Sequence, residues 1–60
     1  DEISGVQQRL NNLGFNCGPE DGEMNDQLRA ALSAFQGKYQ LPQTGEPDAA
    51  TKGKLESVHP

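Results

Sequence analysis

Apolar residues near the start of the chain recur at spacings of three and four, the pattern of one stripe on an amphipathic helix. The stripe consists of Ile3, Val6, Leu10 and Leu13. Ser4 is a candidate cap near the start of this helix, and Gly14 is a candidate stop. The pattern therefore predicts a first helix that ends before Gly14.

A second amphipathic pattern predicts the longest helix of the chain. It begins near Asn25, whose side-chain oxygen can cap free N–H groups, while Asp26 favours the positive end of the helix dipole. Its apolar face consists of Leu28, Ala31, Leu32, Phe35 and Tyr39. We expect Arg29, Gln36 and Lys38 to be turned away from this face.

Turn-forming residues separate the predicted helices. The segment 15–25 carries Gly18, Pro19 and the pair Asp21-Gly22, which favours an ordered loop without helix. The second helix is expected to end near residues 39–40, and the segment 41–45 forms a second turn.

A third helix follows Pro47, with Asp48 as its cap. Thr51, Leu55 and Val58 share its inner face. Three helices and two turn-rich connections, with no alternating strand pattern, predict an all-α class, a compact three-helix bundle.

A weak internal repeat runs through this layout. The pair Val6-Gln7 is echoed by Phe35-Gln36, and the segment 22–25 is echoed by 45–48. Each half uses a glycine turn followed three residues later by a capped helix. Two readings stay open: a true duplication, or two helix starts that independently use favourable turn chemistry.

Length and composition allow one small domain, residues 1–60, with a single core cluster. The large apolar side chains suffice for one core layer between short helices. They are Ile3, Val6, Leu10, Leu13, Phe15, Met24, Leu28, Leu32, Phe35, Tyr39, Leu41, Leu55 and Val58. Because the chain starts at Asp1 without an initiator Met, we expect a module of a longer protein, with any export signal upstream.

Charge and cysteine content exclude several kinds of partner and site. A formal net charge of -4 has the wrong sign for binding nucleic acid or an anionic membrane, so neither is an expected partner. Cys17 is the only cysteine, which excludes an internal disulfide and a cysteine-based zinc site within one chain. No apolar run approaches the ~20 residues of a membrane span.

The ordered motifs of the chain resemble the three-helix peptidoglycan-binding domain found beside bacterial and phage cell-wall hydrolases. No single motif is specific, but their order and spacing cover nearly the whole chain. The matching positions are Val6-Gln7, Leu10, Leu13-Gly14-Phe15, Gly18, Asp21-Gly22, Ala31-Leu32, Phe35-Gln36, Leu41, Thr44-Gly45, Asp48, Thr51 and Leu55.

This resemblance implies a non-catalytic module that holds a linked hydrolase or an injection or secretion component at the wall, outside the cytoplasm, without a cofactor. The expected ligand is a glycan strand or stem peptide of peptidoglycan, held in a polar groove near the two glycine turns. The candidate ligand-binding residues are Asp21, Gly22, Asn25, Gln36, Tyr39, Thr44 and Gly45. Each also has a structural reading as a turn former, a helix cap or a core residue.

Four positions depart from the family pattern: Met24, Asn25 and Leu28 replace the usual Phe, Gly and Thr, and Gln40 replaces a Gly. The loss of the hydroxyl at position 28 is expected to remove a polar group near the ligand groove. The alternative function is therefore a protein-interaction or spacer domain that kept the fold and lost the ligand.

A weaker similarity links residues 35–55 to matrix metalloproteinase prodomains. Those prodomains continue into a cysteine switch, whereas this chain keeps its cysteine in the first loop. The prodomain interpretation is correspondingly disfavoured.

Catalytic and metal chemistry has few candidates. Cys17 and His59 are the only thiol–imidazole pair, and the terminal position of His59 argues against a dyad. The carboxylates of Glu20, Asp21, Glu23 and Asp26 do not have EF-hand spacing, which favours a solvated acidic turn over a calcium site.

Overall fold

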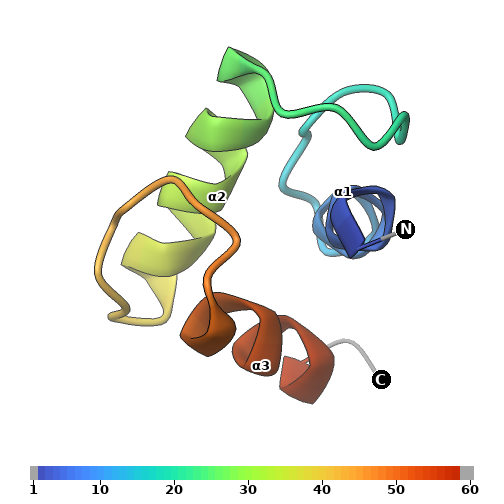
Figure 1. The fold of residues 1–60 in the computed structure, drawn as a ribbon. Helices are drawn as coiled ribbons and strands as arrows, with labels where there is room; N and C mark the ends of the chain where they lie inside the picture. Colours follow the sequence, from blue (N-terminus) through green and yellow to red (C-terminus); the bar gives the residue numbers. More distant parts are fainter. Residues whose placement is uncertain (1, 59–60) are drawn as a thin grey trace.

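Three α-helices joined by two turn-rich connections form residues 2–58, the part of the chain that the computed structural model describes (Figure 1). The helices are α1 (Glu2–Asn12), α2 (Asp26–Lys38) and α3 (Ala49–Val58). α1 packs against both other helices, and Figure 1 shows it nearly end-on beside them. The predicted all-α three-helix class is confirmed. None of these helices is long and apolar enough to cross a membrane.

One apolar cluster lies between the helices. Its buried members are Val6, Leu10, Cys17, Leu28, Ala31, Leu32, Phe35 and Leu55. Phe35 stands at its centre and meets Phe15 edge-on, with ring centroids 5.6 Å apart. The predicted apolar stripes thus form the core. Cys17 joins it as a small hydrophobic residue.

Both predicted caps at the later helices are present. The Leu28 N–H donates to Asn25 Oδ1 at 2.8 Å, and the Thr51 N–H donates to Asp48 Oδ1 at 2.9 Å. Each bond satisfies one of the free donors that an isolated helix start would leave to water. The helices therefore begin where their cap residues predict.

Helix ends use left-handed backbone. α1 stops ahead of Gly14, as predicted, and the φ of Gly14 is +93°. Beyond α2, Gln40 has a φ of +59°, a region that favours glycine and is uncommon for other residues. The departure from Gly at position 40 therefore keeps the turn and introduces local strain.

Two sequence expectations are wrong. Ser4 does not cap α1, because the helix already includes Glu2 and Ser4 lies inside it. Gln36 does not turn away from the core but is fully buried. A buried carboxamide is tolerated only where its polar atoms are paired, and the second turn supplies those partners.

Candidate functional site

A buried glutamine holds the first glycine turn. The Gly22 N–H donates to Gln7 Oε1 at 2.8 Å, and Gln7 Nε2 donates to the Glu23 carbonyl at 3.1 Å and to Asp21 Oδ1 at 3.2 Å. Asp21 Oδ1 also accepts from the Glu23 N–H at 2.9 Å. We call Gln7 and residues 21–23 the first clasp.

A second buried glutamine holds the second turn in the same way. The Gly45 N–H donates to Gln36 Oε1 at 2.9 Å, while Gln36 Nε2 donates to the Glu46 carbonyl at 3.0 Å and to Thr44 Oγ1 at 3.1 Å. Thr44 Oγ1 also accepts from the Glu46 N–H at 3.1 Å. Gln36 and residues 44–46 form the second clasp, and the device repeated in the sequence is repeated in structure.

The glycines are required by these turns. The φ values are +79° at Gly22 and +70° at Gly45, both in the left-handed region. A side chain at position 45 would also meet the Arg29 carbonyl oxygen at 3.5 Å, since the second turn lies against the start of α2. The two turns therefore approach the same end of α2.

The predicted ligand-binding residues divide by exposure. Gln36 and Gly45 are buried and bonded to each other, so in this conformation they hold the second turn. Asp21 and Thr44 are exposed, and Gly22 and Asn25 are half-buried. Hydrogen bonds from the Glu23 backbone and the Gln7 side chain lower the pKa of Asp21, which keeps that carboxyl charged.

Arg29 connects the start of α2 to the second turn. Its guanidinium lies 3.3 Å from Asp26 Oδ1 and 3.7 Å from Glu46 Oε2. These three side chains are between 49% and 104% exposed, so the pairs contribute little energy and open readily. We define the turn surface as Asp21, Asn25, Arg29, Thr44 and Glu46.

The hydrophobic departures near the first turn do not occupy this surface. Leu28 is fully buried in the core, and Met24 is half-buried against it. In the second half, the matching position is Thr51, also fully buried, whose Oγ1 accepts from Gln36 Nε2 at 2.8 Å. Position 28 thus faces the interior, and the expectation of a lost polar group in a groove is wrong.

Tyr39 lies apart from the other candidates. It caps the far end of α2, so it is about 20 Å from Asn25 along the helix. Its ring contacts Phe35, with centroids 4.8 Å apart, and the ammonium groups of Lys54 and Lys38 lie 5.2 and 5.6 Å from the ring centroid. Only an extended ligand reaches both Tyr39 and the turn surface.

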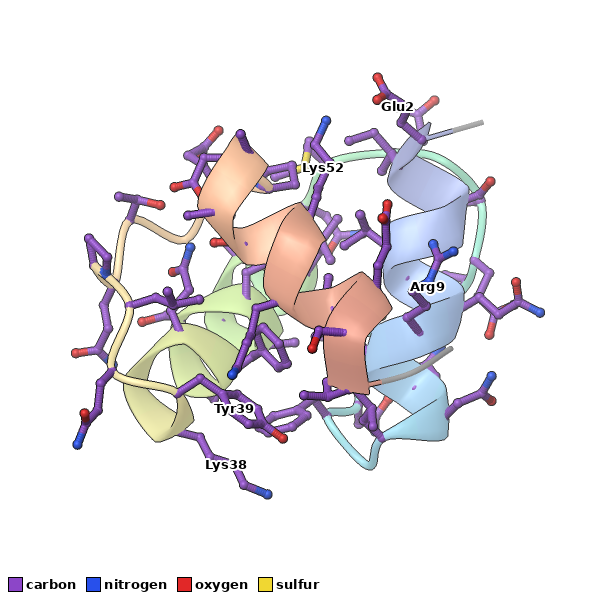
Figure 2. All side chains as sticks on the ribbon, turned by 90° about the horizontal axis from the view of Figure 1, so that it is seen from below. Glu2, Arg9, Lys38, Tyr39 and Lys52 are labelled. Carbon is purple, nitrogen blue, oxygen red and sulfur yellow. The ribbon has the colours of Figure 1, made fainter. Side chains whose placement is uncertain are left out.

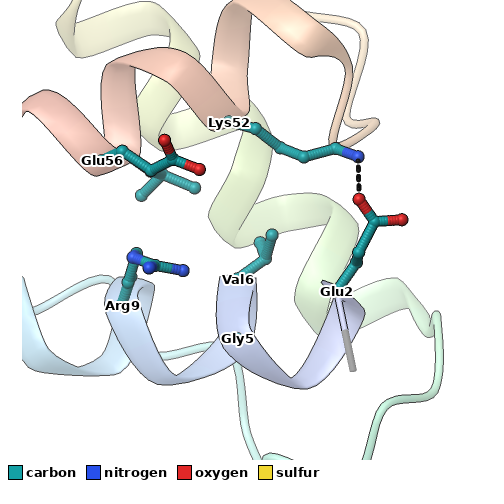
Figure 3. A pocket seen from close by; sticks show the side chains of 7 residues that line it. Glu2, Gly5, Val6, Arg9, Lys52 and Glu56 are labelled. Atoms are coloured by element: carbon teal, nitrogen blue, oxygen red, sulfur yellow. Dashed lines mark hydrogen bonds and ion pairs between the residues drawn. The ribbon is translucent and has the colours of Figure 1, made fainter.

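A pocket of about 110 Å³ lies elsewhere, between α1 and α3 (Figure 3). Figure 2 shows Glu2 and Arg9 on α1 and Lys52 on α3. Val6 and Leu55 form its apolar base, and charged side chains surround it. Sequence reasoning missed this α1–α3 pocket, because its walls come from helices more than 40 residues apart and no local pattern connects them. It also missed Gln7, although the echo of Val6-Gln7 in Phe35-Gln36 points to it.

The described residues offer little support for nucleophilic or metal chemistry. Cys17 is fully buried, its Sγ donates to the Gln7 carbonyl at 3.2 Å, and burial raises the pKa of the thiol. His59 lies outside the described residues. Within residues 2–58, no three His, Cys, Asp or Glu side chains come together as a metal-binding group.

Comparisons with known proteins identify the family of the chain. Residues 1–55 match the family described as "Putative peptidoglycan binding domain". Over 52 residues the chain is 46% identical to the localization factor PodJL of Caulobacter vibrioides, in strains NA1000 / CB15N and ATCC 19089 / CIP 103742 / CB 15. The match covers 85% of this chain and 5% of those relatives. No solved structure matches at comparable significance. The chain belongs to the peptidoglycan-binding domain family.

Proposed function

We propose that this chain binds bacterial peptidoglycan without catalysis and holds the protein segments linked to it at the cell wall, outside the cytoplasm. The observation that carries the proposal is the family match, which runs from α1 into α3 and includes both clasps. The relatives are far longer than this chain, which supports a role as one module among others.

The turn surface supplies polar groups that the hydroxyl and amide groups of peptidoglycan can bind. Asn25 offers a carboxamide, and Asp21 and Glu46 offer acceptors. The exposed Thr44 hydroxyl donates to Asp48 Oδ2 at 3.2 Å and can exchange this partner for a ligand. The clasps fix the backbone beneath these groups, so little conformational entropy is lost on binding. The exposed Asp26–Arg29–Glu46 pairs separate at low cost when a ligand approaches.

Charge limits the affinity. The chain carries a net charge of -4 and peptidoglycan is itself rich in carboxylates, so the two repel at low salt. A weak contact still suffices for tethering, because attachment to an insoluble polymer raises the effective concentration of any linked partner. Anchoring of this kind is also compatible with the name of the relative, a localization factor.

The test is co-sedimentation of the purified chain with insoluble peptidoglycan sacculi at moderate salt. We expect retention of the wild type and reduced retention of Asn25→Ser, which keeps a capping oxygen but lacks the carboxamide. Thr44→Val is expected to reduce retention and Thr44→Ser to preserve it. Circular dichroism has to show that both variants are folded, because Thr44 Oγ1 also accepts hydrogen bonds within the second clasp. Gln8→Ala, on an exposed position of α1, is the control.

The alternative function, a protein-interaction or spacer domain, predicts a different outcome. A chain with a folded circular-dichroism spectrum that stays in the supernatant at every salt concentration would overturn the wall-binding proposal. If the Asn25 and Thr44 variants are retained as well as the wild type, the ligand does not bind at the turn surface.

A further inference from the structure

The α1–α3 pocket has an apolar base and charges at both ends. Val6 and Leu55 are 3% and 1% exposed, and the pocket lies over them. At one end Lys52 Nζ donates to Glu2 Oε1 at 3.2 Å (Figure 3). These two charges pair with each other at this end.

The opposite end carries two charges that do not pair. Arg9 from α1 and Glu56 from α3 both line the pocket and lie on opposite sides of it in Figure 3. No ion pair or hydrogen bond joins them to each other or to another side chain within residues 2–58. The pocket thus presents one cation and one anion, separated, beside an apolar surface.

The guanidinium of Arg9 lies close to Gly5, where a side chain would crowd it. A Cβ at position 5 would lie 3.3 Å from Arg9 Nη1, closer than ordinary van der Waals contact. Glycine inside a helix costs about 1 kcal/mol relative to alanine, so α1 gives up stability at this position. The space gained lets Arg9 lie along the pocket.

We propose that the α1–α3 pocket binds a free α-amino-acid end group, with its carboxylate on Arg9 and its ammonium on Glu56. Aliphatic carbons of the ligand then cover Val6 and Leu55. The volume of about 110 Å³ is well below the roughly 300 Å³ of a site for a larger ligand, so it suits a small end group.

This inference rests on the proposed function for the source of the ligand. Peptidoglycan stem peptides that contain a diamino-dicarboxylic acid carry such a group at the end of an aliphatic side chain. A free amino acid offers the same chemistry, so the experiment has to separate the two sources.

The test is NMR titration of the whole 15N-labelled chain with the tripeptide L-Ala–γ-D-Glu–meso-diaminopimelate. We expect amide shifts at Val6, Arg9, Leu55 and Glu56. The same tripeptide ending in lysine lacks the side-chain carboxylate and should bind about tenfold or more weakly, the effect of one charge-assisted contact. If the tripeptide binds more tightly than free diaminopimelate, the pocket recognises the stem peptide. If the two bind equally, the pocket recognises only the end group.

Variants separate binding from folding. Arg9→Gln and Glu56→Gln should each weaken tripeptide binding about tenfold or more, while Lys38→Gln and Glu20→Gln make the same charge changes outside the pocket and should leave it unchanged. Gly5→Ala should raise the melting temperature and still weaken binding, because its Cβ forces Arg9 Nη1 to shift by a few tenths of an ångström. A purely structural role for Gly5 would not give this combination.

Sacculus retention, measured in parallel, distinguishes the two proposals. Retention without tripeptide shifts, or tripeptide binding unaffected by Arg9→Gln and Glu56→Gln, would overturn the pocket inference and leave wall binding in place. Tripeptide binding without sacculus retention would support the pocket inference and overturn the wall-binding proposal.

Discussion

Gln36 Nε2 lies 2.8 Å from Thr51 Oγ1, and both side chains are fully excluded from solvent. This bond ties the end of α2 to the first turn of α3. The first half of the chain has no equivalent, because Leu28 stands where Thr51 stands in the second half. The carboxamide of Gln36 therefore has four hydrogen-bond partners, with the two hydrogens of Nε2 shared among three acceptors, whereas that of Gln7 has three partners.

This difference predicts unequal costs of removing the two glutamines. Gln36→Ala should lower the free energy of unfolding by about 3–5 kcal/mol, because unpaired buried polar groups cost about 1–3 kcal/mol each. Gln7→Ala should cost less, since its first-clasp partners reach water more easily. Urea unfolding followed by circular dichroism measures both, with exposed Gln8→Ala as the control. Equal losses in the two variants would contradict the asymmetry.

Replacing Leu28 by Thr tests whether position 28 serves the core or a ligand. Burying a leucine side chain contributes about 1.5–3 kcal/mol, and a new hydrogen bond from Gln7 returns about 0.5–1.5 kcal/mol. We therefore expect Leu28→Thr to destabilise the chain by about 1–2 kcal/mol. Sacculus retention of the folded variant should not rise; a gain in retention would place position 28 at the ligand.

Acid should destabilise the chain through Asp48. Hydrogen bonds from the Thr51 side chain and backbone, and from Thr44, lower the pKa of Asp48 below the ordinary value of 3.8. A carboxyl whose pKa is lower in the folded state stabilises the fold above pH 3.8. This contribution is lost as the pH falls through the folded-state pKa. The pKa of Asp21 is lowered in the same direction.

Asp48→Asn separates this titration from the cap. Asparagine keeps a capping oxygen for the Thr51 N–H but does not titrate. Melting temperatures measured from pH 6 to pH 2 should fall less steeply in acid for this variant than for the wild type. Parallel profiles would show that Asp48 does not contribute to acid sensitivity.

Thiol labelling should report opening of the core. Cys17 is fully buried and its raised pKa disfavours the reactive thiolate, so a disulfide reagent reaches it only after unfolding. At pH 8 we expect labelling at least about 100-fold slower in native buffer than in denaturing urea. Comparable rates in the two conditions would contradict the burial of this side chain.

Local chemistry explains what the sequence could predict. Asn25 and Asp48 cap their own helices through bonds spanning three residues, so both helix starts are readable without tertiary information. The prediction that Gln36 turns away from the core is wrong, because helical periodicity treats glutamine as a surface residue. Its partners lie 8 to 15 positions away, and only the repeated turn hinted at them.

The candidate site was less predictable for the same reason. Asp21 and Thr44 were identified as turn formers, and the structure adds that each also accepts hydrogen bonds from a buried glutamine. Arg9 carries no sequence signal, because an arginine in a helix is ordinarily solvated. Its position matters only once α3 brings Glu56 to the same pocket.

The span of the contacts sets an order of assembly. The glutamine bonds of both clasps close loops of 8 to 16 residues, whereas the Glu2–Lys52 bond beside the α1–α3 pocket joins positions 50 apart. Short loops close with the smaller entropic loss, so we expect both turns to form early in folding and the α1–α3 seam to form last. A ligand bound between α1 and α3 would then slow the separation of these two helices and so slow unfolding of the chain.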